Sequence, residues 1–172
     1  MSQLIKRHHR LGRMMMKHWL MAVTLVFSAT SLAAAPYRTP VPPRFDSRGA
    51  DRQAIEALLG HYTQAVSTKD QALFETLLLS KAIPFSGVPL SGKGGNAETA
   101  NYEGFRKAVF EGSPFTQRFQ DIHIEQDGPL AHVSLVFVNT TAKGQSWGWK
   151  TLQLIKVGPD WKITSEFFTG HD

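Results

Sequence analysis

Apolar residues recur on one face of a helix from Asp51 to about residue 67. They follow the i, i+3, i+4, i+7 spacing of a helix that buries one side. The positions are Ile55, Leu58, Leu59, Tyr62, Ala65 and Val66. Thr68 and Lys69 break the pattern, and Asp70 is a good N-cap for a second helix. That helix would bury Leu73, Phe74, Leu77 and Leu78. The pattern predicts a helical hairpin.

The segment from residue 83 to residue 96 contains several prolines and glycines. It predicts a short strand over residues 83–88, followed by a loop at Ser91-Gly-Lys-Gly-Gly-Asn96. This loop lacks the G-x-x-x-x-G-K-[ST] spacing of a phosphate-binding loop, so we interpret it as a lid or connection. A third helix follows, with Tyr102, Phe105 and Val109 on its buried side, and it ends at Gly112 and Pro114.

From Phe119 onward the apolar period changes to two, which is typical of half-buried strands. We expect an antiparallel meander with later strands at residues 146–157 and 161–168. Asp127-Gly128 is a hairpin signal, and as a two-residue loop it would place Ile124 opposite Ala131 and His123 opposite His132. Helices and a sheet with one apolar face each predict an α+β domain, with the helices on one face of a curved, mainly antiparallel sheet.

The first 35 residues differ in composition from the rest of the chain. A basic segment to Lys17 precedes an apolar stretch from Trp19 to Leu32 and then Ala33-Ala34-Ala35. This order predicts a signal peptide over residues 1–35, cleaved after Ala35, and a periplasmic or secreted protein. The alternative is an uncleaved anchor, but polar residues interrupt the apolar stretch before the ~20 residues that span a bilayer. We expect no membrane association after cleavage.

Residues 36–49 are rich in proline and form an expected linker, and residues 50–172 form the expected domain. Five of the 19 Lys and Arg residues lie in the leader, which has no Asp or Glu, so 14 basic and 14 acidic residues remain. The mature chain is therefore formally neutral and has no basic cluster, which excludes nucleic acid as an expected partner. The chain has no cysteine, so packing alone must stabilise it after export.

The order of these elements resembles the NTF2-like superfamily. The resemblance rests on Tyr62-Thr-Gln-Ala-Val-Ser-Thr-Lys-Asp70 and on the closing Leu152-Gln-Leu-Ile-Lys-Val-Gly-Pro-Asp-Trp161-Lys-Ile163. Within the superfamily the chain is most similar to SnoaL-like and lumazine-binding type domains. The resemblance implies a cone of three helices on a bent sheet, a pocket at the open end, and frequent homodimers through the sheet. Members include isomerases, dehydratases and binding proteins, so the fold does not select a function.

The ketosteroid isomerases of this superfamily use a tyrosine and two acids. Tyr62 matches the tyrosine, but the acids would fall near Ser86 and Leu152, and neither is a carboxylate. Proton abstraction needs a positioned base, so the sequence favours a protein without this catalysis. Tyr62 is alternatively a core tyrosine that satisfies its hydroxyl at a polar edge.

Two further groups of residues are candidate sites. His123 and His132 would be cross-strand neighbours and are a weak candidate for a zinc site, but a solvated face or a dimer rim is the better interpretation because zinc needs more ligands. Trp147 and Trp149 would lie on one side of their strand and Lys150 on the other. Such an aromatic pair favours a dimer surface or core over a ring-stacking platform.

We expect an exported protein that binds a small, partly apolar molecule in the cone, with no assigned catalysis and no cofactor. The expected lining is aromatic with one possible anion contact: Tyr62, Phe74, Phe85, Phe105, Arg106 and Phe137. One alternative is a lyase or isomerase of the same fold that uses Tyr62. Another is a protein-interaction module that acts through the sheet face.

Overall fold

The computed structural model describes residues 45–89 and 98–171 of the 172-residue chain. The expected signal peptide, most of the expected linker and the loop at 91–96 lie outside these residues. Within these residues, ten helices and strands form one α+β domain. Most of them occur in the order that the sequence predicts. No described helix has the length and hydropathy needed to cross a bilayer.

Helices α1 (Gly49–Thr68) and α2 (Gln71–Leu77) form the predicted hairpin. The six apolar positions expected to be buried on α1 are all buried. Lys69 ends α1 in a left-handed conformation with φ of 62°, and its N–H donates to the Ala65 carbonyl. The Asp70 carboxylate then accepts a hydrogen bond of 2.9 Å from Leu73 N, which confirms the predicted N-cap.

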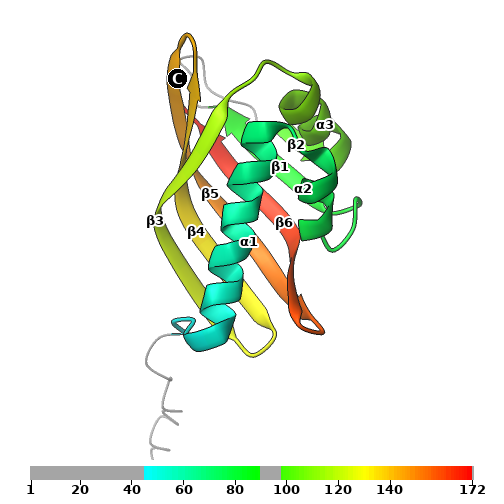
Figure 1. Cartoon of the computed structure of the whole chain (residues 1–172), viewed down its shortest axis with the longest axis vertical. Coiled ribbons are helices and arrows are strands. Elements are labelled where there is room, and N and C mark those ends of the chain that lie inside the picture. The colour runs from blue at the N-terminus through cyan, green and yellow to red at the C-terminus, as the bar shows by residue number, and fades with distance from the viewer. Residues whose placement is uncertain (1–44, 90–97, 172) are drawn as a thin grey trace, which may run out of the picture. The chain divides into compact units, whose positions relative to one another are not determined.

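The strands form one six-stranded sheet in the order β2-β1-β6-β5-β4-β3 (Figure 1). Their bounds are β1 Pro84–Pro89, β2 Glu98–Asn101, β3 Thr116–Asp127, β4 Leu130–Thr141, β5 Gly144–Val157 and β6 Asp160–Gly170. Only β1 and β6 pair in parallel; the other neighbours are antiparallel. The sequence did not predict β2, because its four residues Glu-Thr-Ala-Asn have no apolar alternation.

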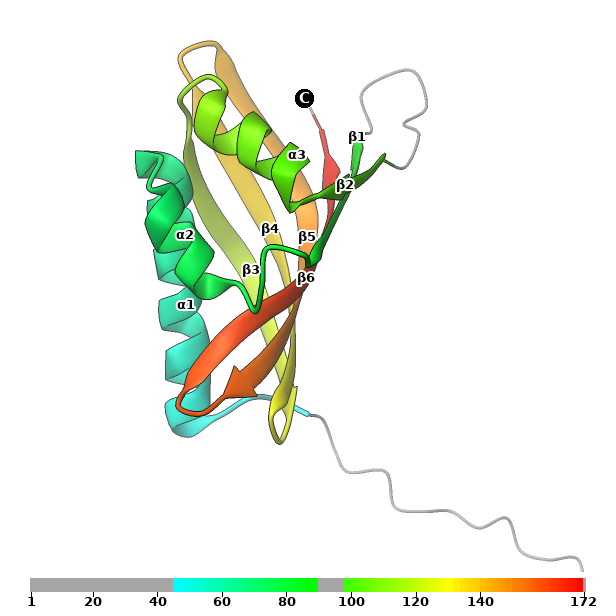
Figure 2. The ribbon, with the colours of Figure 1, turned by 90° about the vertical axis from the view of Figure 1, so that its right-hand side faces the viewer.

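All helices lie on one face of the curved sheet (Figure 2). The third predicted helix is present and ends before Gly112 as expected: α3 spans Tyr102–Arg106 and continues as a π-helical turn, η1, over Lys107–Glu111. The core lies between this helical layer and the inner face of the sheet. The first residues of the domain are held to the sheet. Ser47 N donates to the Ile124 carbonyl of the edge strand β3, and Lys156 of β5 and Trp161 of β6 donate to the Asp51 carboxylate of α1.

The register of the β3–β4 hairpin differs from the prediction. The loop is Gly128-Pro129, so Ile124 faces Val133 and His132 faces Glu125, while His123 faces Ser134. Gly128 has a φ of 56°. Proline fixes its own φ near −65°, and glycine followed by such a residue suits a type II′ turn. The prediction was wrong because it gave the turn to Asp127-Gly128 and left Pro129 to begin a strand.

Two irregularities shape the inner face of the sheet. In β3, Asp121 has a φ of 53° and, with Ile122, lies opposite the single residue Leu135. In β6, the register slips so that Leu154 pairs with Ile163 and Gln153 with Ser165, which leaves Thr164 as the extra residue. Bulges of this kind bend a strand and increase its twist. The second bulge also changes which residues of β6 face inward.

Gly148 and Gly60 provide a matched test of the packing. A Cβ at Gly148 would lie 1.7 Å from the Thr169 carbonyl oxygen and 2.7 Å from the Phe137 ring, whereas one at Gly60 meets nothing within 4 Å. We expect Gly148→Ala to lower the free energy of unfolding by about 2 kcal/mol or more, because backbone must move. Gly60→Ala, on the exposed side of α1, should raise it by about 0.5–1 kcal/mol. Urea denaturation measures both; an unchanged midpoint for Gly148→Ala would contradict the close approach.

Candidate functional site

A cavity of about 470 Å³ lies between α3 and η1 on one side and strands β3 to β6 on the other. Its apolar wall is mostly aromatic and consists of Phe85, Phe105, Phe115, Phe137, Phe168 and Trp147. Gly104 and Ala108 contribute a strip of small residues from the helical side. Its polar residues are Gln117, Asn139, Ser146, Lys150, Glu166 and His171. This composition, apolar walls with a few polar groups, is typical of a small-molecule site.

The cavity ends on a buried cluster of Tyr62, Lys150 and Glu166. Lys150 Nζ lies 2.7 Å from Glu166 Oε1, and the two side chains are 4% and 0% exposed. Lys150 Nζ also donates to the Tyr62 hydroxyl at 2.6 Å. That hydroxyl in turn donates to Glu166 Oε2 at 2.7 Å. Three elements, α1, β5 and β6, therefore meet through one polar cluster inside an apolar core.

Burial and charge act on these groups in opposite ways. Burial lowers the pKa of the Lys150 ammonium from its ordinary value, although the Glu166 charge counteracts this. Burial, followed by the Glu166 charge and hydrogen bond, raises the pKa of the Tyr62 phenol well above 10. The phenol therefore stays protonated at neutral pH and serves as a hydrogen-bond donor to the carboxylate.

Aromatic rings surround the Lys150 ammonium. Its Nζ lies 4.5 Å from the centroid of the Tyr62 ring, 5.2 Å from that of Phe137 and 5.7 Å from that of Phe168. Such contacts favour a cation over ring faces. The rings therefore replace part of the water that the ammonium loses on folding.

Two buried oxygens at the cavity have no hydrogen-bond partner among the described residues. Glu166 Oε1 makes no geometrically ideal hydrogen bond, but it lies 2.7 Å from the Lys150 ammonium, which is its charge partner. The other is Gln117 Oε1; the same side chain donates through Nε2 to Asn139 Oδ1 at 2.7 Å. Buried polar atoms are nearly always paired, so the Gln117 oxygen indicates a further partner such as a ligand or water.

Trp147 and His171 form one rim of the cavity. Their backbones exchange two hydrogen bonds, of 3.0 and 2.7 Å. Their rings stack with centroids 4.1 Å apart and an interplanar angle of 12°. The rim is thus held by both the main chain and the side chains at the end of β6.

The residues predicted to bind a ligand are distributed over three places. Phe85, Phe105 and Phe137 line the cavity. Tyr62 and Phe74 are fully buried in the core behind it, with ring centroids 4.9 Å apart. Arg106 borders a different, charged hollow and pairs with Glu103 and Glu111 at 2.9 and 2.6 Å.

The histidine pair does not meet as the sequence suggested. His123 and His132 are both on the outer face but face different partners, Ser134 and Glu125, because the hairpin loop lies one residue further along the chain than expected. His132 Nδ1 is instead 3.2 Å from Gln153 Nε2. Within residues 45–89 and 98–171, no three His, Asp or Glu side chains gather as metal ligands would.

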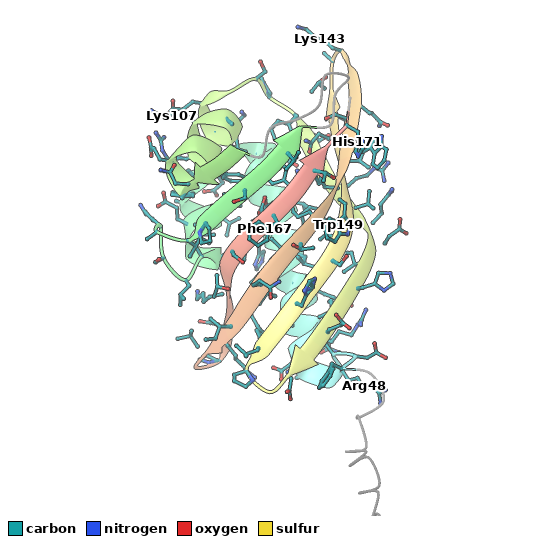
Figure 3. All side chains as sticks on the ribbon, turned by 180° about the vertical axis from the view of Figure 1, so that it is seen from behind. Arg48, Lys107, Lys143, Trp149, Phe167 and His171 are labelled. Carbon is teal, nitrogen blue, oxygen red and sulfur yellow. The ribbon has the colours of Figure 1, made fainter. Side chains whose placement is uncertain are left out.

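Trp147 and Trp149 lie on one side of β5 and Lys150 on the other, as predicted. Trp149 and the neighbouring Phe167 lie on the sheet face away from the helices (Figure 3). The side chains of Trp147, Trp149 and Phe167 are about half exposed. Trp149 Nε1 donates to Ser134 Oγ at 2.9 Å.

Sequence reasoning missed Lys150 and Glu166 as a pair. Lys150 had a signal, since strand alternation placed it on the same side as the apolar Leu152 and Leu154. Glu166 had none, because the bulge at Thr164 reverses the alternation that Ile163 begins. Glu166 pairs directly with Leu152, the position where the isomerase resemblance required an acid. The carboxylate is therefore present near that position, but on the neighbouring strand.

Comparisons with known proteins identify the fold. No protein-family model matches the chain, and no curated protein matches it. Solved structures do match. An NTF2-like protein of unknown function from Shewanella baltica OS155 is 16% identical with a TM-score of 0.56, over 73% of this chain and 99% of that one. An NTF2-like protein from Cytophaga hutchinsonii ATCC 33406 is 18% identical with a TM-score of 0.56, over 72% and 100%.

A third match is a protein from Novosphingobium aromaticivorans DSM 12444 whose name proposes a scytalone dehydratase. It is 13% identical with a TM-score of 0.53, over 71% of this chain and 85% of that one. The domain therefore has the NTF2-like fold, as the sequence resemblance implied. At these identities the comparisons concern the fold alone.

The buried cluster makes a direct prediction about stability. Glu166→Leu leaves the Lys150 ammonium buried without its counter-charge, so we expect a loss of about 3–5 kcal/mol in the free energy of unfolding. The double variant Lys150→Met, Glu166→Leu removes both charges and should be more stable than Glu166→Leu alone. Chemical denaturation measures the series. Additive losses in the double variant would contradict a coupled pair.

Alkaline pH provides a second test of the cluster. The folded protein keeps the Tyr62 proton at pH values where the unfolded chain loses it, because the folded pKa is raised well above 10. The stabilisation from this group is therefore complete below pH 10 and is lost as pH rises above it. We expect the free energy of unfolding of Tyr62→Phe to fall less steeply between pH 9.5 and 11 than that of the unmodified protein. Equal slopes would show that the phenol titrates normally.

Proposed function

We propose that this domain binds a small, mostly apolar molecule that has a polar end, in the cavity between α3 and the sheet. The observation that supports this most is the cavity wall itself, which is mostly aromatic and carries a few polar groups, among them the buried Gln117 Oε1 that has no partner among the described residues. The NTF2-like fold is compatible with binding and with catalysis, so the proposal rests on the site and not on the fold.

The aromatic walls provide the main source of affinity. Phe85 and Phe105 stack with centroids 4.6 Å apart, and Phe137 meets Phe168 edge to face at 6.2 Å. Apolar surface buried against such walls contributes about 25 cal/mol per Å². A ligand of cavity size therefore gains most of its binding free energy from the rings, and the polar atoms fix its orientation.

The polar cluster is difficult to explain by stability alone. A buried charge pair is often no more stable than apolar residues of the same volume. Retaining this arrangement at a cavity wall favours a functional role for Lys150 and Glu166.

Export and assembly complete the proposal. The leader of residues 1–35 supports delivery to the periplasm or the exterior, with a mature chain that begins at Pro36. The exposed Trp149 and Phe167 on the outer sheet face support a homodimer through that face, since aromatic residues are enriched in interfaces. A partner protein on the same surface is the corresponding alternative.

A catalytic role is the second candidate, favoured by one observation. Glu166 is a carboxylate on the cavity wall within hydrogen-bond reach of Tyr62, which supplies the acid that positions 86 and 152 lack. A lyase or isomerase could use Glu166 to move a proton and Tyr62 to hold the carboxylate in place. The match whose name proposes a scytalone dehydratase shows that a dehydratase has been suggested for this fold.

Native mass spectrometry of protein from a periplasmic extract tests binding and export together. We expect a mature chain beginning at Pro36 with an additional small mass, which is released on denaturation and identifies the ligand by weight. Phe105→Arg introduces a cation into the cavity wall and should abolish the added mass, because the charge replaces apolar contact.

Trp149→Arg is the matched control. It changes the outer face and should leave the added mass intact while it converts dimers to monomers. Circular dichroism establishes that both variants are folded. A folded protein that carries no added mass, in either the unmodified or the control form, would contradict the binding proposal and favour interaction through the sheet.

A further inference from the structure

We infer that Lys69 fastens one wall of the aromatic cavity and thereby sets how fast a ligand enters and leaves it. This wall belongs to the α3–β3 connection, residues 107–115, which contributes Val109 and Phe115 to the cavity. The inference rests on the proposed binding function and identifies the residue that controls access to the site.

The Lys69 ammonium is bound by three backbone carbonyls of the α3–β3 connection. Its Nζ donates to Val109 O at 2.5 Å, to Gly112 O at 2.8 Å and to Ser113 O at 3.2 Å. A lysine ammonium has three N–H donors, so each of them has an acceptor here. The centroid of the Phe115 ring lies 5.8 Å from the same nitrogen, which adds a cation–π contact.

These carbonyls need an outside donor because the helical segment ends at a proline. In a π-helical turn the carbonyl of Val109 would accept from the residue five positions later, and this residue is Pro114, which has no N–H. The last carbonyls of a helix also attract a cation. Lys69 therefore supplies, from the end of α1, the donors that the connection itself lacks.

The α3–β3 connection has few other polar ties to the fold. Within residues 45–89 and 98–171, its hydrogen bonds to elements other than α3, with which it is continuous, all come from Lys69. Residues 111–114 are exposed, so packing does not hold them either. The end of this wall is therefore attached mainly through one side chain.

Both neighbours of this stretch are fixed more firmly. Before it, Phe105 of α3 stacks on Phe74 and Phe85 with centroids 5.0 and 4.6 Å away. After it, Gln117 N donates to Ser67 Oγ at 2.9 Å, and β3 pairs with β4. Loss of the Lys69 bonds would therefore free the stretch between two fixed points and leave the rest of the cavity in place.

The backbone of Lys69 makes this fastening separable from stability. Lys69 ends α1 with φ of 62° and ψ of 27°, in the left-handed region where glycine is favoured and a Cβ is costly. Lys69→Gly therefore removes the ammonium and relieves this strain at the same time. Lys69→Met removes the ammonium and keeps the strain, so it should be the less stable of the two variants.

Hydrogen exchange of the purified mature protein at pH 7, followed by mass spectrometry, tests the fastening. We expect exchange in residues 107–115 to be about tenfold faster or more in both variants, because losing even one hydrogen bond to a charged group shifts an opening equilibrium by about this factor. Exchange in β4 and β5 should not change. Unchanged exchange in residues 107–115 of Lys69→Gly would overturn the inference.

Stopped-flow fluorescence with N-phenyl-1-naphthylamine, an uncharged aromatic dye, tests the control of access. In both variants the association and dissociation rate constants should rise by about tenfold, while Kd stays within about threefold, because the walls that the bound dye contacts are the same. Lys162→Met is the matched control. It removes a lysine that donates to a carbonyl of α2, Thr76 O, and should change neither rate.

The outcomes separate this inference from the function on which it rests. If the dye binds and its rates are the same in Lys69→Gly as in the unmodified protein, the inference is overturned and the binding function stands. A change of rates in Lys69→Met alone would also overturn it, because the effect would then follow stability and not the ammonium. If the dye does not bind to the folded unmodified protein, the proposed function is contradicted and the inference falls with it.

Discussion

The structure depends on one buried interaction, the contact of Lys150 with Glu166 and Tyr62 inside an apolar core. Two opposite charges can be buried only when each has the other and enough hydrogen bonds to replace water. Helix α1 supplies the phenol, β5 the ammonium and β6 the carboxylate, so the helical layer and the sheet must close in one arrangement. A shift of α1 along the sheet would separate the Tyr62 hydroxyl from both charges. The cluster thus fixes the geometry of the cavity that lies against it.

The sheet can bring these groups together because it is irregular. The bulge at Thr164 turns Glu166 toward the interior, where regular alternation from Ile163 would have turned Ser165 inward. The bulge at Asp121 bends β3 around the helical layer. Together they create a curved inner face with space in front of a charged pair, which a flat sheet packed on the same helices would fill with side chains.

Apolar periodicity predicted most of the fold, because helix and strand faces are repeated patterns that packing must respect. The stripe from Ile55 to Val66, the Asp70 cap and the opposite sides of Trp149 and Lys150 all follow from it. The hairpin register and the inward turn of Glu166 did not, since each depends on a single residue, Pro129 or Thr164, that interrupts a period. Several residues of the aromatic walls could be recognised in the sequence, because they occupy apolar positions of the predicted helices and strands. The acid that completes the site was not, because its orientation is set by an insertion and not by a pattern.

Strand β5 serves two surfaces at once, and Gly148 is the residue that permits this. On either side of it, Trp147 lies at the cavity rim and Trp149 on the outer face. Lys150 faces the cavity, and the Phe137 ring and the Thr169 carbonyl occupy the space where a side chain at 148 would lie. Because Phe137 can close over Gly148, its ring lies 5.2 Å from the Lys150 ammonium and forms part of the cavity wall. A larger residue at position 148 would displace that ring and alter the surroundings of the cation. The outer aromatic face and the inner binding site are therefore coupled through one small residue, and a change at either surface of β5 is expected to reach the other.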